Sequence, residues 1–516
     1  MNNKEFWEDK EKDIIFQANK LNIIESCVDR HAKKNPNKLA FVFEFENKSI
    51  KKYTYKELEK EVNQFANYLN SLKIKKNSRI FLFLPKLPEM YIAFLAVIKQ
   101  GSIAVPLFEA FQSEGLDLRL QRGDADVLIT NKELTKRLSK EVKKKIKTLK
   151  NIIIIDDQDF KKKLEKQKTE FKAVLKNKKD TAFMIFTSST AGTPIAGIQI
   201  PHYALIQQHF TAKLVLDLKQ KDNYWCTAHP GWITGAVYGI LAPLSIGCTN
   251  FILEAHFDAK KWIEFLKRNK ISVMYTAPTA LRMLKPEIKK EDFKGIRNIA
   301  SVGEALTSSV FDFYKNLGIE INDSYWQTET GALMISNTPL MKKKSGSMGK
   351  PLPGINATIK DGMIIIKKSW PAMMTGIYKH EKMYKEYFNK KWFKTNDLAR
   401  IDNEGYFFFE ARKDDMIKSS GERISPIEIE SILMKHKAVK ETAVIGIPDE
   451  IKGQIIKAFI VLNKGFEETN QLKEELMSFV KQNYAGHSYP KQIQFIKEFP
   501  KTNSGKIIKM ELKNLK

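Results

Sequence analysis

Cysteine is scarce in this chain, and the cysteines present lie far apart. Only three occur in 516 residues, at Cys27, Cys226 and Cys248. None belongs to a CxxC pair, so the sequence offers neither a disulfide framework nor a cysteine metal cluster. Such scarcity is typical of proteins from a reducing compartment, and we expect all three side chains to be small core residues.

Long apolar runs are missing as well. The best candidate, Tyr91–Ile98, is flanked by Glu89 and Lys99 and is much shorter than the roughly 18 residues that a membrane-spanning helix needs. Residues 1–20 interleave Lys, Glu and Asp where a secretory signal would have its apolar core. We therefore expect no membrane association and a cytoplasmic location.

Arginine is rare, although the chain is strongly basic. The net charge is +27, but only 11 of the 87 basic residues are arginines, and the lysines are spread along the whole chain. A basic field attracts phosphate backbones. Scattered lysines without interleaved aromatic residues are, however, typical of a solvated surface, so we expect no specific nucleic-acid partner. A basic cleft would still favour small anionic ligands such as nucleotides.

The rest of the composition is that of a folded protein with more than one domain. From about residue 40 to residue 302, short β-rich runs alternate with amphipathic stretches such as Pro88–Gly101, which is the rhythm of βαβ units. Buried parallel strands are predicted at Arg79–Leu84, Ile103–Leu107, Ile152–Ile155, Phe183–Phe186, Val273–Thr276 and Ile299–Val302. The fold class predicted for this large part is α/β, built on mainly parallel sheets.

A new pattern begins near Lys413. It contains a helix from Pro426, strands near Thr442–Ile447 and Lys457–Leu462, and a helix near Gln471–Gln482. About 100 residues suffice for a small α+β domain. The sequence therefore predicts one domain over 1–413 and a second over 414–516.

Three polar segments have the composition of anion or metal sites. Thr187–Pro194 directly follows a predicted strand, and its hydroxyls, glycine and backbone N–H groups suit a phosphate. Asp323–Gly331 contains Glu329, an oxygen ligand of the kind that Mg²⁺ prefers. Pro500–Lys506 ends in Lys506, a cation suited to developing phosphate charge. Taken singly, each segment also suits an ordinary surface turn.

Together, and in this order, the three segments resemble the motifs of the adenylate-forming acyl-CoA synthetase superfamily. Thr187–Pro194 resembles its TSGTTGxPKG loop, Tyr325–Gly331 its YWQTETG segment, and Pro500–Lys506 its PKTxSGK tail. Further segments are similar to the acetyl-CoA synthetases of that superfamily: Tyr224–Gly235, Tyr275–Thr279, Ser301–Ala305, Gly346–Pro351 and Ser420–Arg423. The similarity runs from about residue 20 to the C-terminus.

This resemblance implies a two-step reaction that uses ATP, Mg²⁺ and CoA. Acetate would attack the α-phosphate of ATP to give acetyl-AMP and pyrophosphate, and the CoA thiol would then attack the acyl carbon. For ATP and AMP it implies Thr187, Ser188, Ser189, Thr190 and Gly192 at the phosphates; Gly303, Glu304 and Ala305 at adenine; Asp323, Ser324, Tyr325, Trp326, Gln327 and Thr328 along the nucleotide; Asp397 at the ribose; and Arg412 and Arg423 at ribose and phosphate.

The resemblance also implies catalytic and hinge residues. Glu329 would hold Mg²⁺, Lys506 would stabilise the pentavalent phosphorus, and the mobile small domain would pivot at Asp414 between the two steps. Thr234, Ser420, Gly421 and Lys481 would face CoA. His436 matches a position near a cation site, although a lone histidine on a helix is more often structural. Acylation of Lys506 would remove its charge, which makes it a candidate control device.

The acyl pocket implied by the resemblance is small. It would be lined by Trp232, Ile233, Thr234, Gly235 and Trp326. Trp326 stands where related longer-chain synthetases have a small residue, so its indole should close the pocket after two or three carbons. A missing methylene is rejected only weakly, by roughly 1 to 3 kcal/mol. Acetate is therefore the expected acid, and propionate a slower substrate.

Several positions depart from the family pattern. Ile195 replaces the lysine of the phosphate loop, Ser189 replaces a glycine, His229 replaces a common aspartate, and Ala411 replaces another glycine. Two alternatives follow. One is a medium-chain or aryl acyl-CoA synthetase of the same fold, which Trp326 opposes. The other is a degenerate nucleotide-binding relative with little adenylating activity, which the presence of Lys506, Glu329, Asp397 and Arg412 opposes.

Overall fold

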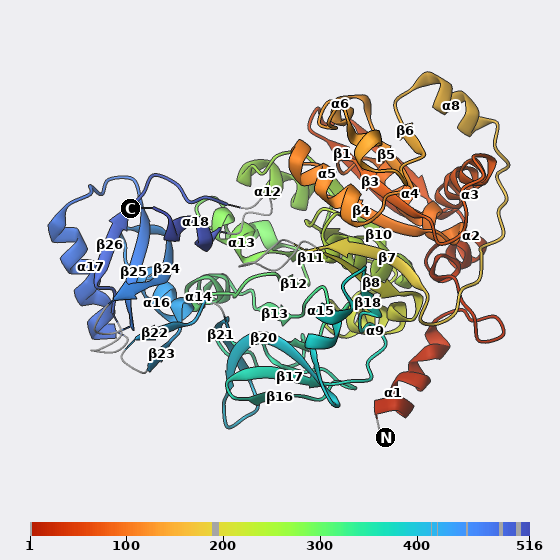
Figure 1. Cartoon of the computed structure of the whole chain (residues 1–516). Coiled ribbons are helices and arrows are strands. Elements are labelled where there is room, and N and C mark those ends of the chain that lie inside the picture. Colours follow the sequence, from red (N-terminus) through yellow and green to blue (C-terminus); the bar gives the residue numbers. More distant parts are fainter. Residues whose placement is uncertain are drawn as a thin grey trace.

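The apolar runs of the large part pair into two extended sheets (Figure 1). The structure is a computed structural model, and it describes residues 3–187, 196–413, 415–419, 422–449, 453–483, 489–501 and 507–515. Most of the strands in both sheets are parallel. The predicted α/β class is therefore confirmed.

The first sheet has seven strands in the order β18-β8-β7-β4-β3-β5-β6. They are β18 (Gly376–Ile377), β8 (Gly197–Pro201), β7 (Thr181–Phe186), β4 (Ile103–Leu107), β3 (Arg79–Phe83), β5 (Val127–Thr130) and β6 (Asn151–Ile154). The strands from β7 to β6 run parallel, whereas β8 is antiparallel to β7 and β18 to β8.

The second sheet has nine strands in the order β15-β14-β13-β12-β11-β9-β10-β1-β2. They are β15 (Lys350–Pro351), β14 (Ile335–Ser336), β13 (Ile321–Tyr325), β12 (Asn298–Ser301), β11 (Val273–Thr276), β9 (Asn223–Cys226), β10 (Thr249–Glu254), β1 (Leu39–Phe45) and β2 (Ile50–Thr54). The strands from β13 to β1 are parallel, and short antiparallel strands close both edges.

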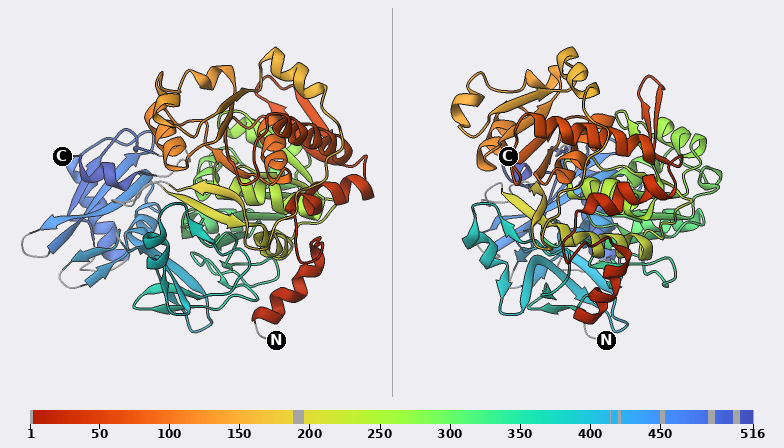
Figure 2. Two further views of the ribbon diagram at one scale, coloured as in Figure 1. Left: turned by 45° about the vertical axis from the view of Figure 1, so that its right-hand side comes forward. Right: turned by 90° about the vertical axis from the view of Figure 1, so that its right-hand side faces the viewer.

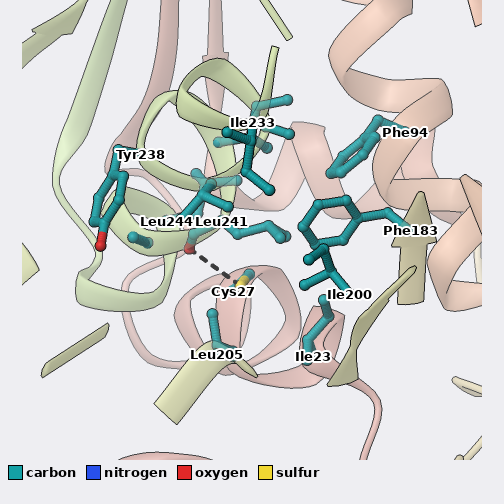
Figure 3. Close-up of a cluster of buried hydrophobic side chains, with 14 of the residues drawn as sticks. Ile23, Cys27, Phe94, Phe183, Ile200, Leu205, Ile233, Tyr238, Leu241 and Leu244 are labelled. Atoms are coloured by element: carbon teal, nitrogen blue, oxygen red, sulfur yellow. Dashed lines mark hydrogen bonds between the residues drawn. The ribbon is translucent and has the colours of Figure 1, made fainter. Parts of the chain in front are cut away.

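Apolar helices fill the space beside these sheets. The helix α4 (Pro88–Lys99) is buried along almost its whole length, because its sequence is apolar on nearly every face. Its Phe94 packs with Phe183 and Ile200 of the first sheet and with Ile233 and Leu241, which follow β9 (Figure 3). This cluster is the largest core of the molecule. No helix among the described residues is both long and apolar enough to cross a membrane.

The remaining helices of the large part are short or lie at the surface. They are α1 (Asn3–Lys10), η1 (Glu11–Asp13), η2 (Glu25–Asp29), α2 (Arg30–Lys34), α3 (Tyr55–Ser71), α5 (Ser113–Arg122), α6 (Lys132–Thr135), α7 (Val142–Lys145), α8 (Gln158–Glu165), η3 (His202–Ala204), α9 (Leu205–Leu214), α10 (Ile233–Ala236), η4 (Val237–Leu241), α11 (Ala242–Ile246), α12 (Ala259–Arg268), α13 (Pro278–Leu284), η5 (Lys290–Phe293), α14 (Ser308–Asn316) and α15 (Glu381–Glu386). The Trp7 indole of α1 donates to the Gly354 carbonyl, in the loop before the third sheet, at 3.2 Å. Figure 2 shows the N-terminal α1 at the surface of the large part.

A third sheet, antiparallel throughout, follows the two large ones. It comprises β16 (Ala357–Lys360), β17 (Met363–Lys367), β19 (Phe388–Asn389), β20 (Trp392–Ile401) and β21 (Phe407–Arg412). The pairing of β20 with β21 places Asp397 opposite Arg412. The sequence pattern had predicted mainly parallel strands and had not revealed this sheet.

The C-terminal part has its own small sheet and its own core (Figure 1). It contains the antiparallel pair of β22 (Ile417–Ser419) and β23 (Glu422–Ile424), the helices α16 (Pro426–Leu433), α17 (Asn470–Asn483) and α18 (Lys509–Lys513), and the sheet of β24 (Val439–Asp449), β25 (Gly453–Leu462) and β26 (Gln492–Phe495). This confirms the predicted α+β character of the second domain. The boundary between residues 413 and 414 stays a prediction.

Candidate active site

The residues predicted to bind a nucleotide gather where β12 and β13 end. The two strands are parallel, and Ser301 pairs with Asp323. Strand β20 of the third sheet lies close to the same ends, because Tyr325 at the end of β13 contacts Asp397. Ligands of open α/β sheets bind at the carboxyl ends of the strands. The geometry therefore places these residues where a ligand is expected.

Asp397 is the centre of this arrangement. Its side chain is buried, and its Oδ2 accepts a hydrogen bond from the Tyr325 hydroxyl at 2.8 Å and from Gln327 Nε2 at 2.6 Å. The Arg412 Nε lies 3.9 Å from the other carboxylate oxygen. Gln327 also donates to the Thr395 carbonyl at 2.8 Å. The structure thus brings together four predicted site residues, two from the end of β13 and the turn after it and two from the paired strands β20 and β21.

Glu329 lies beside the third sheet and is half-buried. The Tyr387 hydroxyl donates to its Oε1 at 3.0 Å, and the Tyr387 ring stacks on Phe393. Burial raises the pKa of Glu329, while the Tyr387 hydrogen bond and the charge of Arg412 act in the opposite direction. Tyr387 had not been predicted as a site residue, because nothing in its local sequence distinguishes it from other surface tyrosines.

The segment predicted at adenine is fixed by α13. Glu304 accepts from the Thr279 N–H at 3.0 Å and from its hydroxyl at 2.5 Å, and the Arg282 guanidinium donates to it at 3.1 Å. Gly303 has a φ of +97°, a conformation that glycine adopts most readily, and Ala305 after it is half-buried. The carboxylate of Glu304 therefore holds this loop in place.

Asp323 and Ser324 are buried, and both are hydrogen-bonded to Ser301. The Ser301 hydroxyl donates to Asp323 Oδ1 at 2.5 Å, and the Ser324 hydroxyl donates to the Ser301 carbonyl at 2.6 Å. Burial raises the pKa of Asp323 to about 7, although the hydrogen bond from Ser301 lowers it. Thr328, two residues beyond Trp326, is half-buried.

Of the residues predicted to line the acyl pocket, Ile233, Thr234 and Gly235 belong to α10 and Trp232 directly precedes it. Trp326 is only 8% exposed, and its indole meets the Tyr238 ring edge-to-face with centroids 5.2 Å apart. Trp232 is the residue before α10, and Thr234 in its first turn is half-buried. Ile233 points into the large core (Figure 3). Position 235 must be glycine, because an added Cβ would lie 2.1 Å from the His229 carbonyl oxygen.

Several predicted residues lie outside the described part of the chain. They are Ser188, Ser189, Thr190, Gly192, Asp414, Ser420, Gly421 and Lys506. Arg423 belongs to β23, but its side chain is likewise not described. Thr187 is described, and its N–H donates to the Ala196 carbonyl at 3.3 Å. That contact brings together the two ends of the predicted phosphate loop.

The two predicted residues of the C-terminal part with described side chains differ in character. Lys481 is exposed near the end of α17, with its amine 5.7 Å from the Tyr489 ring centroid. His436 is buried, and its Nε2 lies 3.1 Å from Glu475 Oε1, while its Nδ1 accepts from the Ala438 N–H at 3.3 Å. Both ring nitrogens are engaged, which favours the structural role. No group of three or more His, Cys, Asp or Glu side chains within the described ranges is arranged to hold a metal ion.

Comparison with known proteins identifies the family. The family model described as "AMP-binding enzyme" matches residues 28–364, and the model of its C-terminal domain matches residues 428–506. The chain belongs to the AMP-binding enzyme family. This AMP-binding enzyme is 41% identical over 521 residues to an acetyl-coenzyme A synthetase of Bacillus subtilis (strain 168), a match that covers 96% of this chain and 90% of that relative.

Other relatives agree with this assignment. An acetyl-coenzyme A synthetase of Methanothrix thermoacetophila is 34% identical over 550 residues, covering 96% of this chain and 83% of that protein. Among solved structures, the anthranilate CoA ligase AuaEII in complex with anthranoyl-AMP has a TM-score of 0.88 and 25% identity, and the match covers 96% of this chain and 98% of that one. The AMP-binding enzyme thus has the adenylate-forming fold along nearly its whole length.

Proposed function

We propose that this AMP-binding enzyme ligates acetate to CoA through acetyl-AMP and releases AMP and pyrophosphate. The near full-length identity of 41% to an acetyl-coenzyme A synthetase supports this reaction. The observation that carries the choice of acid is the buried indole of Trp326. It is held against Tyr238, whose hydroxyl is itself bonded to the Thr211 hydroxyl at 2.8 Å and the Leu333 N–H at 3.0 Å. A wall fixed in this way leaves room for a short acid only.

In this proposal the nucleotide lies along Tyr325–Thr328, with its ribose at Asp397. The carboxylate is held by Tyr325 and Gln327 and lies across the strand pair from Arg412. Gln327 Oε1 is buried and accepts no hydrogen bond within the described ranges, so a ligand hydroxyl is a suitable donor for it. Arg412 would place its guanidinium beside the ribose and the phosphates.

The site residues also suit magnesium and the chemistry at phosphorus. Glu329 offers carboxylate oxygens, which Mg²⁺ prefers, and this cation takes few protein ligands when phosphates and water supply the others. When bound with ATP, Mg²⁺ would neutralise part of the triphosphate charge. Lys506 would stabilise the negative charge that builds up as an acetate oxygen attacks the α-phosphorus and pyrophosphate leaves.

In the second step, the small domain would present a different face to the site. We place the domains at 1–413 and 414–516, with Asp414 as the pivot. After adenylation the small domain would turn so that Ser420, Gly421 and Lys481 face CoA, with Thr234 near the acyl carbon. The thiolate sulfur then forms the thioester bond to that carbon, and AMP leaves with the electron pair of the broken C–O bond.

Lys506 also offers a means of control. Its acylation would remove the positive charge needed for adenylation. We expect acylated protein to lose ATP–pyrophosphate exchange and to keep thioester formation from added acetyl-AMP. Equal loss of both half-reactions would contradict this role.

The proposed function is tested by ATP–pyrophosphate exchange with acetate, propionate, butyrate, octanoate and benzoate. Exchange should peak at acetate or propionate, and Trp326→Gly should move the peak toward longer acids because the indole wall is gone. Trp7→Gly is the matched control, since it removes another buried indole and should leave the order of acids unchanged. A peak at octanoate or benzoate would favour the medium-chain or aryl alternative, and exchange with no acid would favour the degenerate relative.

A further inference from the structure

His229 joins three loops at the carboxyl ends of strands from both large sheets. It follows β9 of the nine-stranded sheet, whereas its two partners, Leu84 and Glu109, follow β3 and β4 of the seven-stranded sheet. Its Nε2 lies 2.8 Å from Glu109 Oε2 and 3.1 Å from the Leu84 carbonyl oxygen. The imidazole is 5% exposed. These contacts are therefore made in the interior of the molecule.

The hydrogen bonds of the ring show which nitrogen accepts and which donates. His229 Nδ1 accepts from the Gly231 N–H at 2.9 Å, so this nitrogen carries the lone pair. A ring proton is then on Nε2, which donates to the Leu84 carbonyl, and Glu109 Oε2 lies 2.8 Å from the same nitrogen. Burial raises the pKa of Glu109, whereas the contact with His229, a backbone hydrogen bond and the charge of Lys86 lower it.

The backbone of His229 holds the start of α10. Its carbonyl accepts from the Trp232 N–H at 3.0 Å. A Cβ on Gly231 would lie 2.4 Å from the Phe108 nitrogen, so the β9–α10 loop lies directly against the β4–α5 loop. The Phe108 ring centroid is 5.1 Å from that of His229 and 5.7 Å from that of Trp232. A shift of the imidazole would thus be passed on to the indole of Trp232.

The β4–α5 loop is itself fixed from its other side. The Arg137 guanidinium donates to the Glu109 carbonyl, and also to the Phe111 carbonyl at 3.4 Å. The Arg119 guanidinium lies over the Phe111 ring, 3.7 Å from its centroid. The loop that carries Glu109 is therefore held on both sides and serves as a support for the loop that leads into α10.

We propose that His229 is a positioning residue that sets the width of the acyl pocket through its pair with Glu109. This inference rests on the proposed function. By tying the β9–α10 loop to Leu84 and Glu109, His229 fixes where Trp232 and Thr234 stand, and hence which acids fit beside Trp326. The aspartate common at this position in the family would place a second carboxylate against Glu109. The histidine and Glu109 thus form a matched pair in this chain.

The test measures acid selectivity in His229→Asp, in His229→Asp with Glu109→Gln, and in His229→Gln. The single change to Asp should raise the KM for acetate about ten-fold and narrow the preference for acetate over propionate, since two carboxylates repel at close range. The KM for ATP should change less than about two-fold. Removing the second charge in the double variant should restore the KM for acetate to within about three-fold of the unchanged enzyme.

His229→Gln is the control for a loss of folding caused simply by replacing the histidine. A glutamine amide places a donor near the position of Nε2, so this variant should keep the selectivity of the unchanged enzyme. Unaltered selectivity in folded His229→Asp, or a double variant no better than the single one, would overturn the inference while leaving the proposed function intact. If the unchanged protein activates no acid, the proposed function fails first and this inference fails with it.

Discussion

Asp397 shows how the site depends on single side chains. Gln327 and Asp397 are 70 positions apart, and the shared carboxylate oxygen between them also accepts from Tyr325. Two donors directed at one buried oxygen require a full acceptor at that point. The carboxylate therefore organises the protein side of the pocket before any ligand binds.

Asp397→Asn should raise the KM for ATP by about ten-fold or more, because an amide cannot accept both hydrogen bonds equally and no longer attracts Arg412. The free energy of unfolding should fall by about 1 to 3 kcal/mol, since a buried donor loses its partner. ATP titration and urea unfolding measure the two effects. Asp402→Asn, which removes a carboxylate paired with Lys344 just beyond the end of the same strand, is the control. Equal ATP binding by Asp397→Asn would contradict the assignment.

Sequence similarity predicted many of the candidate site residues, but it did not predict the side-chain contacts that position them. Asp397, Tyr325 and Gln327 were predicted at the nucleotide, and the structure brings them into contact. Thr395 and Tyr387 were not predicted, because their roles arise only from tertiary contacts with Gln327 and Glu329. Residue type and spacing carry no signal for such contacts.

At the scale of elements, the turn after β13 depends on one glycine. Gly331 has a φ of +70°, and an added Cβ would lie 2.0 Å from the Ala372 carbonyl oxygen. This turn carries Gln327 and Glu329 into the site. Gly405 also has a positive φ, +83°, but nothing lies within 4 Å of its hypothetical Cβ. A substitution at Gly405 therefore adds backbone strain only, whereas a substitution at Gly331 adds both backbone strain and a steric clash.

Gly331→Ala should abolish adenylation and lower the free energy of unfolding by more than about 2 kcal/mol, since a buried backbone clash adds to the strain. Gly405→Ala should lower the free energy of unfolding by only about 1 kcal/mol, because alanine is strained in the left-handed conformation. This variant should keep its activity. Urea unfolding and ATP–pyrophosphate exchange on both variants give the comparison. Equal stability losses in the two variants would show that the contact with Ala372 is unimportant.

The elements differ in how far sequence predicts them. The bounds predicted for β4 and β11, Ile103–Leu107 and Val273–Thr276, agree with the structure, because continuous apolar runs are typical of buried parallel strands. Strands β20 and β21 were missed. Their exposed and buried positions do not alternate regularly, and β20 pairs irregularly between Leu398 and Ala399. Long-range antiparallel pairing of this kind leaves little trace in a local pattern.

At the scale of the whole molecule, α16 joins the small domain to the third sheet. The Ser425 hydroxyl donates to the Glu410 carbonyl at 2.6 Å, and Arg400 lies 3.9 Å from Glu428. The proposed turn of the small domain would have to break these contacts. Both contacts are partly exposed, which suits the proposed turn of the small domain.

Stability should fall in mild acid because several buried histidines are neutral. Burial lowers the pKa of His31 and His209 to about 4 and that of His202 to about 3, below the unfolded value of about 6.5. Below that value the unfolded chain takes up protons that the folded chain cannot. Each histidine should therefore cost about 2 kcal/mol of stability as the pH falls from about 6.5 to about 5. Asp323, whose pKa is raised to about 7, acts in the opposite direction and offsets roughly the contribution of one histidine, so the net change is still a loss.

Urea midpoints at neutral pH and at about pH 5 measure this loss. His202→Gln should flatten the dependence on pH, because it removes a buried group that must otherwise be protonated on unfolding. His256→Gln is the matched control, since His256 is exposed, and it should leave the dependence unchanged. Identical pH slopes for the two variants would rule out this source of acid sensitivity.

In the proposed reaction, acetate is activated by attack of its own oxygen on the α-phosphorus of ATP. Acetate labelled with oxygen-18 in both positions tests this directly when it is turned over with ATP and CoA. We expect one labelled oxygen in AMP, one in the thioester carbonyl and none in pyrophosphate, since the attacking oxygen stays on phosphorus when the thiol displaces AMP. Unlabelled AMP, or label in inorganic phosphate together with ADP, would contradict an acyl-adenylate and with it the proposed function.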